Sequence, residues 1–118
     1  MAGRLDKKII VLSGGTRGMG EAQVRGMVRE GAHVVFGGRD RAAGAAIEAD
    51  LGGGAHYQPL DVTSASDWKA IVDFAATRFG RIDGLVNNAG VGATHALTEI
   101  SDEAWADIIA VNQTGVFF

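Results

Sequence analysis

The amino-acid sequence predicts an α/β protein built on a doubly wound parallel sheet. Short apolar and β-branched runs alternate with longer segments of helical periodicity, and glycines mark several boundaries between them. Strands that alternate with helices imply right-handed crossovers, which make the strands parallel and place helices on both faces of the sheet. No repeat or linker interrupts the pattern. We therefore expect residues 1–118 to form a single domain.

Two strand-helix units occupy the first part of the chain. Residues 8–12 form a β-branched run typical of a strand buried on both faces. The helical pattern of residues 20–30 follows, and Gly31 is expected to end it. Residues 34–36 form a second short strand that ends at two glycines. A helix over residues 42–51 is then closed by the three glycines after it.

Two further units complete the pattern. A third strand is expected at residues 57–60. Ser64 then caps a helix that ends at Gly80. Its apolar residues are expected to fall on one stripe, namely Trp68, Ile71, Val72, Ala75 and Phe79. The fourth strand covers residues 85–87. Ser101 caps a final helix with two acids in its first turn, where the helix dipole favours negative charge.

Composition excludes several kinds of function. The chain has 118 residues and a net charge of −3 with its signs interspersed, so it offers no basic tract for nucleic acid. No apolar run approaches the ~20 residues needed to cross a bilayer, and the N-terminus does not resemble a signal peptide. The chain has no cysteine, and its three histidines lack partners at ligand spacing, so we expect no metal site. A cytoplasmic setting fits this composition.

The candidate binding residues follow the strands, because ligands of such sheets bind outside the carboxyl ends of the strands. Glycines at positions 14, 18 and 20 give the spacing G-x-x-x-G-x-G between the first strand and the first helix. Such a turn lets the backbone come close to a pyrophosphate, and the first N–H groups of the helix favour an anion. A dinucleotide is the leading ligand. A glycine-rich turn without a ligand is the alternative.

The glycine spacing and the later run Asn87-Asn88-Ala89-Gly90 together resemble the short-chain dehydrogenase/reductase family, whose pattern is T-G-x-x-x-G-x-G followed by N-N-A-G. Ser13 stands where the family has Thr and keeps its hydroxyl. The resemblance extends from Lys7 to Phe118. It implies a Rossmann-like fold and an oxidoreductase that transfers a hydride between NAD(P)(H) and a ketone or secondary alcohol. The sequence is most similar to bacterial hydroxysteroid dehydrogenases and 3-oxoacyl carrier-protein reductases, which suggests a steroid-like or 3-oxoacyl substrate.

The resemblance also implies which residues contact the cofactor. They are Gly14, Thr16, Arg17, Gly18, Met19, Gly20, Gly38, Arg39, Asp61, Val62, Asn88, Ala89, Gly90, Val91 and Val111. Asp61 is expected to accept a hydrogen bond from the adenine amino group, although its position before Ser64 also suits a turn or helix cap. Asn87 is expected to tie neighbouring strands together through its amide.

The end of the second strand favours NADP(H) over NAD(H). The position at which NAD-preferring members of the family carry Asp falls on Gly38, and Arg39 follows it. An NADP(H) site places cations where they pair with the 2′-phosphate of the cofactor, which suits Arg39, and Arg17 adds a second positive charge near that phosphate. NAD(H) stays possible because Asp40 takes the ribose position if the strand ends two residues later, and Arg39 is then a surface charge.

Asn112 is the one catalytic candidate in the sequence. Trp105, Ile109, Asn112 and Val116 recur at helical spacing, so we expect Asn112 on a buried stripe. The run Val111-Asn112-Gln113-Thr114-Gly115 resembles a segment of the family. The resemblance implies that its Asn holds a water in the proton relay behind the family's catalytic lysine. The alternative is a core Asn that kinks the helix or ties it to its neighbours.

The Ser and the Tyr-x-x-x-Lys motif on which hydride transfer in the family relies are not in this sequence. Its one tyrosine, Tyr57, begins a strand and has no Lys four residues later. We therefore expect the amino-terminal half of a family member, truncated after about four β-α units by an early stop or by processing. A homo-oligomer is expected for the family. A non-catalytic, dinucleotide-binding or self-associating fragment is the alternative.

Overall fold

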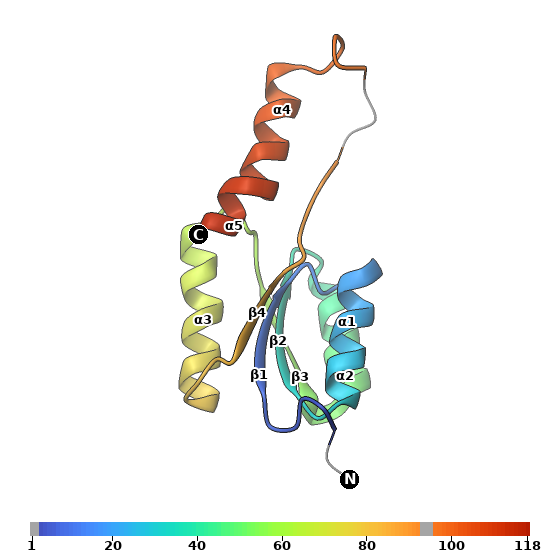
Figure 1. Cartoon of the computed structure of the whole chain (residues 1–118), viewed down its shortest axis with the longest axis vertical. Helices are drawn as coiled ribbons and strands as arrows, with labels where there is room; N and C mark the ends of the chain where they lie inside the picture. The colour runs from blue at the N-terminus through green and yellow to red at the C-terminus, as the bar shows by residue number, and fades with distance from the viewer. Residues whose placement is uncertain (1–2, 93–95) are drawn as a thin grey trace.

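The computed structural model describes residues 3–92 and 96–118 as one parallel sheet with helices on both faces (Figure 1). The strands are β1 (Ile9–Ser13), β2 (His33–Gly38), β3 (Ala55–Pro59) and β4 (Gly84–Asn87). Three helices flank them: α1 (Gly18–Arg29), α2 (Arg41–Leu51) and α3 (Ala65–Phe79). The four-stranded sheet has the order β3-β2-β1-β4, and every neighbouring pair is parallel. The predicted fold class, a Rossmann-like α/β sheet, is confirmed.

The core has two layers, because successive side chains of a strand point to opposite faces of the sheet. On one face Leu12 and Phe36 pack with Val24 of α1 and Ile47 of α2. The opposite face is covered by α3, and its cluster consists of Val11, Val35, Leu60, Val62, Trp68, Ile71 and Ala75. All five residues of β1 are buried. The prediction that this β-branched run forms a strand covered on both faces is therefore confirmed.

The helix ends follow ordinary capping chemistry. The hydroxyls of Ser64 and Ser101 accept hydrogen bonds from the backbone N–H groups of Asp67 (3.2 Å) and Ala104 (3.0 Å), as predicted. Gly80 ends α3 in the left-handed conformation, with φ at 75°. The first helix begins at Gly18, two residues before the predicted start, and β3 ends at Pro59 rather than at residue 60.

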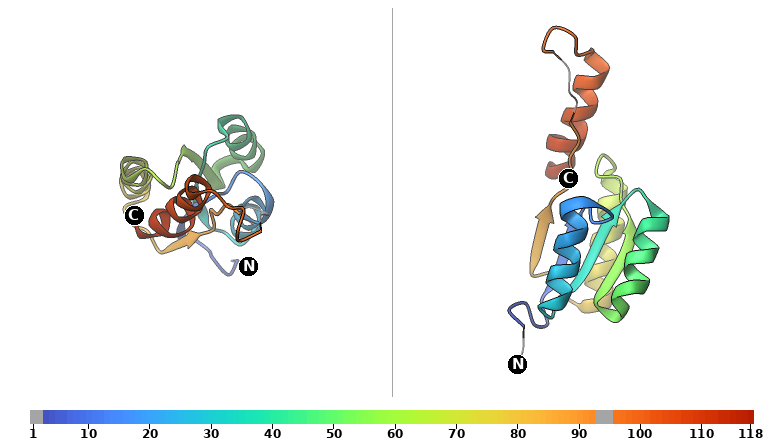
Figure 2. Two further views of the ribbon diagram at one scale, coloured as in Figure 1. Left: turned by 90° about the horizontal axis from the view of Figure 1, so that it is seen from above. Right: turned by 90° about the vertical axis from the view of Figure 1, so that its right-hand side faces the viewer.

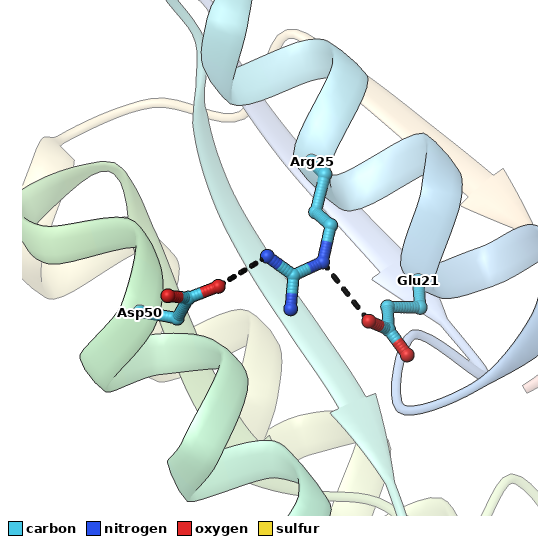
Figure 3. A network of polar contacts seen from close by, with 3 residues as sticks. All are labelled: Glu21, Arg25 and Asp50. Carbon is cyan, nitrogen blue, oxygen red and sulfur yellow. Dashed lines mark hydrogen bonds and ion pairs between the residues drawn. The ribbon is translucent and has the colours of Figure 1, made fainter.

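Helices α1 and α2 lie side by side on one face of the sheet and share a polar link (Figures 1 and 3). The guanidinium of Arg25 in α1 donates to Glu21 one turn earlier (2.9 Å) and to Asp50 in α2 (2.5 Å). Because these groups are accessible to water, the link adds little to stability. It orients two helices that otherwise meet through apolar side chains.

The C-terminal segment differs from the expected buried helix. Helix α4 (Asp102–Ile109) leads into a π-helical turn at Ala110–Thr114 and then into α5 (Gly115–Phe117). No residue of α4 is buried, and Trp105 and Val116 are 57% and 46% exposed. The predicted buried stripe is therefore wrong. Two features explain it: α4 extends beyond the carboxyl edge of the sheet (Figures 1 and 2), and the π turn breaks the 3.6-residue spacing.

A smaller correction concerns α3. Trp68, Ile71 and Ala75 are buried as expected, but Val72 is 40% exposed. Val72 lies with Leu85 and Phe117 around a cavity of about 320 Å³ beside β4, so it faces past the sheet rather than into the core. In the described residues no helix has both the length and the apolar character required to span a membrane.

Candidate functional site

A cleft of about 680 Å³ lies at the carboxyl edge of the sheet. Its walls come from the glycine-rich turn after β1 and from the segments that follow β2, β3 and β4. The lining residues are Gly14, Thr16, Arg17, Gly18, Met19, Gly20, Gly38, Arg39, Asp40, Leu60, Asp61, Val62, Asn88, Ala89, Gly90, Val91 and Val111. The structure thus brings together every residue predicted as a cofactor contact. Asn112 is not among the lining residues.

Two lining residues, Asp40 and Leu60, are not among the predicted cofactor contacts, although the sequence offered Asp40 as the ribose ligand of an NAD(H) site. Asp40 is the N-cap of α2, and its side chain accepts a hydrogen bond from the backbone N–H of Ala43 (3.0 Å). An Asp directly before a helix is a recognisable capping signal, so this second role of Asp40 is also visible in the sequence. The sequence predicts Leu60 only as the last residue of a strand, and nothing in the pattern indicates that it lines a binding site.

The glycine-rich turn is tied to the end of β2 and supplies free donors. The backbone N–H groups of Gly14 and Gly15 both donate to the Gly37 carbonyl, at 2.9 Å. Gly14 and Gly18 have positive φ, at 75° and 58°. Among the described residues no side chain caps α1 at Arg17, which leaves the N–H groups of its first turn available. A turn of this kind fits an anion such as a pyrophosphate.

Ser13 and Asn88 join this turn to the segment after β4. The buried Ser13 hydroxyl accepts from the backbone N–H groups of Asn88 and Ala89, each at 3.1 Å. The Asn88 amide donates to the Gly14 carbonyl at 3.0 Å. The strand tie expected of Asn87 is therefore made by its neighbour. Asn87 is exposed, and its amide makes no hydrogen bond within the described residues. It ends the edge strand β4 and lines the cavity beside that strand rather than the cleft.

The end of β2 carries the expected positive charge. Gly38 is its last residue, and a Cβ there would lie 2.7 Å from Cγ2 of Thr16, so the turn and the strand end are in close contact. Arg17 and Arg39 are exposed and line the cleft. Asp40 also lines it, but one of its oxygens is engaged in capping α2.

Asp61 forms a local turn at the end of β3. One oxygen of its carboxylate accepts from the backbone N–H (2.9 Å) and from the hydroxyl (2.7 Å) of Thr63. These bonds hold the pKa of the carboxyl below its ordinary value, with a smaller contribution from Arg39. The turn cap considered from the sequence is thus present. Its other oxygen has no partner among the described residues.

Asn112 holds the loop after β4. Its amide oxygen accepts from the backbone N–H of Val91 at 2.8 Å, and its amide nitrogen donates to the Val91 carbonyl at 2.7 Å. The residue lies in the π-helical turn and is exposed. Its two hydrogen bonds connect Val91, which lines the cleft, to the C-terminal segment.

The parallel sheet and the glycine-lined cleft at its carboxyl edge define a Rossmann-like α/β protein. The chain belongs to the short chain dehydrogenase family, whose family model matches residues 8–118. It is 47% identical over 117 residues to the 3-alpha-(or 20-beta)-hydroxysteroid dehydrogenase of Mycobacterium tuberculosis. That match covers 99% of this chain and 45% of the relative. The chain therefore spans about half the length of the curated relatives that it matches.

Two solved structures from Brucella melitensis are similar over the same region. A short-chain dehydrogenase/reductase described as SDR:Glucose/ribitol dehydrogenase superposes with a TM-score of 0.94 at 34% identity, covering 99% of this chain and 50% of that one. A 3-ketoacyl-(acyl-carrier-protein) reductase complexed with NADH superposes with a TM-score of 0.92 at 32% identity, covering 96% and 47%. The resemblance to the family, including hydroxysteroid dehydrogenases and oxoacyl reductases, is confirmed.

Proposed function

We propose that residues 1–118 form the nucleotide-binding domain of an NAD(P)(H)-dependent oxidoreductase that acts on a ketone or secondary alcohol. The observation that carries this proposal is the convergence of four strand ends on one cleft lined by all the expected contact residues. The names of the relatives support a steroid-like or 3-oxoacyl substrate. The cysteine-free composition supports a cytoplasmic location.

The residues around the cleft fit a dinucleotide. The free N–H groups of α1 suit the pyrophosphate, and the lack of a Cβ at Gly18, which has no atoms within 4 Å of that position, leaves room for it. Asp61 keeps one carboxylate oxygen for the adenine amino group, next to Val62. Gly90 and Val91 lie on the side where the nicotinamide would be held. The bound cofactor would supply or accept the hydride.

Preference for NADP(H) over NAD(H) is part of the proposal. Arg17 and Arg39 are both exposed at the cleft, where they would pair with a 2′-phosphate. Asp40, the residue that would favour NAD(H), caps α2 with one of its oxygens. NAD(H) remains the alternative cofactor, and the similar 3-ketoacyl reductase is complexed with NADH.

We assign Asn112 two roles: it positions the loop at Val91, and it holds a water of the proton relay. Beyond its two bonds to Val91, its amide keeps one hydrogen and one lone pair, which suit an ordered water. The Tyr-x-x-x-Lys motif that the family resemblance implies as the source of the general acid is not in this sequence. The hydroxyl of the one tyrosine, Tyr57, donates to the Gly38 carbonyl at 2.6 Å. The acid would have to come from outside this segment.

Self-association is a second candidate function. Apolar side chains are exposed around the cavity beside β4, among them Leu85 at 53% and Phe117 at 85%. Large exposed apolar patches mark contact surfaces, and β4 is an edge strand. This candidate supports the expected homo-oligomer, and sedimentation velocity of the purified chain tests it.

The proposed function is tested by titrating the purified chain with NADPH and NADH while following tryptophan fluorescence, alongside a turnover assay with a ketosteroid and a 3-oxoacyl thioester. We expect binding without turnover. Arg39→Ala should weaken NADPH binding about tenfold and leave NADH binding nearly unchanged, because it removes a charge-assisted hydrogen bond. Arg41→Ala is the matched control, since Arg41 does not line the cleft.

Two outcomes would contradict this proposal. Failure of the chain to bind either nucleotide would refute the assignment of the cleft. Turnover by these 118 residues would refute the conclusion that the general acid lies elsewhere.

A further inference from the structure

The last two carbonyls of β2 point to opposite neighbours. The Gly37 carbonyl accepts from Gly14 and Gly15 of the glycine-rich turn. The Gly38 carbonyl accepts on the β3 side, from the Tyr57 hydroxyl at 2.6 Å and from the Leu60 backbone N–H at 3.2 Å. The strand end is thus held between the turn and β3. The Tyr57 hydroxyl makes the shorter of the two bonds on the β3 side.

Tyr57 is itself placed by packing. It is the register partner of Phe36 in β2, and the two ring centroids lie 5.6 Å apart. Its ring also fills the space above Gly44 of α2, where a Cβ would lie 2.5 Å from the ring carbon Cγ. Burial raises the pKa of the Tyr57 hydroxyl, so the group remains a protonated donor at neutral pH. The ring position and the protonated hydroxyl both favour the hydrogen bond to the Gly38 carbonyl.

The bond to Gly38 orients the next peptide group. Every peptide bond in the described residues is trans, so the N–H of Arg39 points opposite to the Gly38 carbonyl. Since that carbonyl points toward β3, the Arg39 N–H points toward the glycine-rich turn, where Thr16 contacts the strand end. Within the described residues this N–H makes no hydrogen bond. Thr16, Gly38 and Arg39 all line the cleft, whereas Tyr57 does not.

We propose that Tyr57 is a positioning residue for the adenosine 2′-phosphate of NADP(H). By holding the Gly38 carbonyl, its hydroxyl presents the Arg39 N–H to the cleft beside the Arg39 guanidinium, so that one phosphate meets both donors. Tyr57 therefore contributes to the choice between cofactors without touching them. This inference rests on the proposed nucleotide-binding function and adds a residue that the cleft itself does not contain.

Tyr57→Phe tests the inference, because it removes the hydroxyl and keeps the ring packed on Phe36 and Gly44. We expect the Kd for NADPH to rise about fivefold and the Kd for NADH to rise less than about twofold, since a hydrogen bond to a charged phosphate is stronger than one to a neutral hydroxyl. Ser101→Ala is the control. It removes the cap of α4, away from the cleft, and should leave both affinities unchanged.

A measurement on the unsubstituted chain gives an independent readout. The amide proton resonance of Arg39 should move downfield when 2′-AMP is added, and 5′-AMP should leave it in place. Equal effects of Tyr57→Phe on NADPH and NADH, no effect on either, or an unmoved Arg39 resonance would overturn the role of Tyr57 while the proposed function stands. If the unsubstituted chain binds neither nucleotide, the proposed function fails and the inference fails with it.

Discussion

Gly20→Ala should destabilise the protein and abolish nucleotide binding, while Gly26→Ala in the same helix should stabilise it. A Cβ at Gly20 would lie 2.6 Å from the Asn88 side-chain nitrogen and closer still to the Gly14 carbonyl oxygen. At Gly26 the nearest atom lies 3.7 Å away, at the end of the flexible Arg29 side chain. The same methyl group is therefore forced into the glycine-rich turn at one position and enters open space at the other.

The expected magnitudes follow from these distances. Replacing a helical glycine by alanine stabilises a protein by roughly 0.5–1 kcal/mol when the site is open, and we expect this for Gly26→Ala. At Gly20 the overlap costs about 1–3 kcal/mol. Loss of the Asn88 bond to the Gly14 carbonyl costs about 1 kcal/mol more. Alanine also brings its gain of roughly 0.5–1 kcal/mol at this helical position, so the net destabilisation by Gly20→Ala is about 1–3.5 kcal/mol. For a domain of this size each kcal/mol lowers the Tm by roughly 4 °C.

Urea unfolding gives the two free energies, and an NADPH titration below the unfolding transition gives the affinities. We expect opposite signs for the two stability changes. Binding should be lost in Gly20→Ala and retained in Gly26→Ala, because only the first moves the turn. Equal stabilities of the two variants, or normal NADPH binding by folded Gly20→Ala, would refute the close packing of α1 against the turn.

Two further perturbations test the hydrogen bonds of Ser13 at the cleft and the burial of His56 in the sheet. Ser13→Ala leaves the part-buried Ala89 N–H without an acceptor, whereas the Asn88 N–H keeps its bond to the Val86 carbonyl, so the free energy of unfolding should fall by about 1–2 kcal/mol. Lowering the pH should also destabilise the fold, because burial and then Arg78 hold the pKa of His56 below 6.5. The unfolded chain then binds the proton more readily, so the stability present above pH 6.5 is lost as the pH falls through 6.5 toward the folded pKa.

Controls for both experiments keep the geometry. Ser13→Thr retains the hydroxyl and should restore most of the lost stability. A loss in Ser13→Thr as large as in Ser13→Ala would contradict the hydrogen-bonding argument. For the pH experiment, urea midpoints are measured from about pH 7 to about pH 5. His56→Gln should make the midpoint depend less on pH over this range. An unchanged midpoint over this range in the original chain would contradict the assignment to His56.

Much of the candidate site is predictable because parallel strands end at the same edge of a sheet. The residues after β1, β2, β3 and β4 are far apart in the sequence, yet all of them line one cleft. The patterns that failed depend on a packing partner. The periodicity through Trp105 and Val116 assumes a surface against which α4 could pack, but that helix extends past the sheet and is broken by a π turn.

Pairings between distant groups are the part that local patterns do not contain. Nothing near Asn112 indicates that both ends of its amide bond Val91, which is 21 residues away. The sequence likewise favours Asn87 over Asn88 as the strand tie, because it does not say which of two adjacent amides faces the glycine-rich turn. The bond from Tyr57 to the Gly38 carbonyl depends on the register of β2 with β3.

The sequence by itself determined the class of fold, the family and most of the residues at the cleft, because β-branched runs, glycine spacing and strand ends are local features with a fixed geometric meaning. The tertiary structure decided the strand order, the exposure of the C-terminal helix and the hydrogen bonds of Ser13, Tyr57 and Asn112. Those depend on which segments meet in space. A hydrogen bond requires its partners within about 3 Å and well aligned, and no local pattern contains that information.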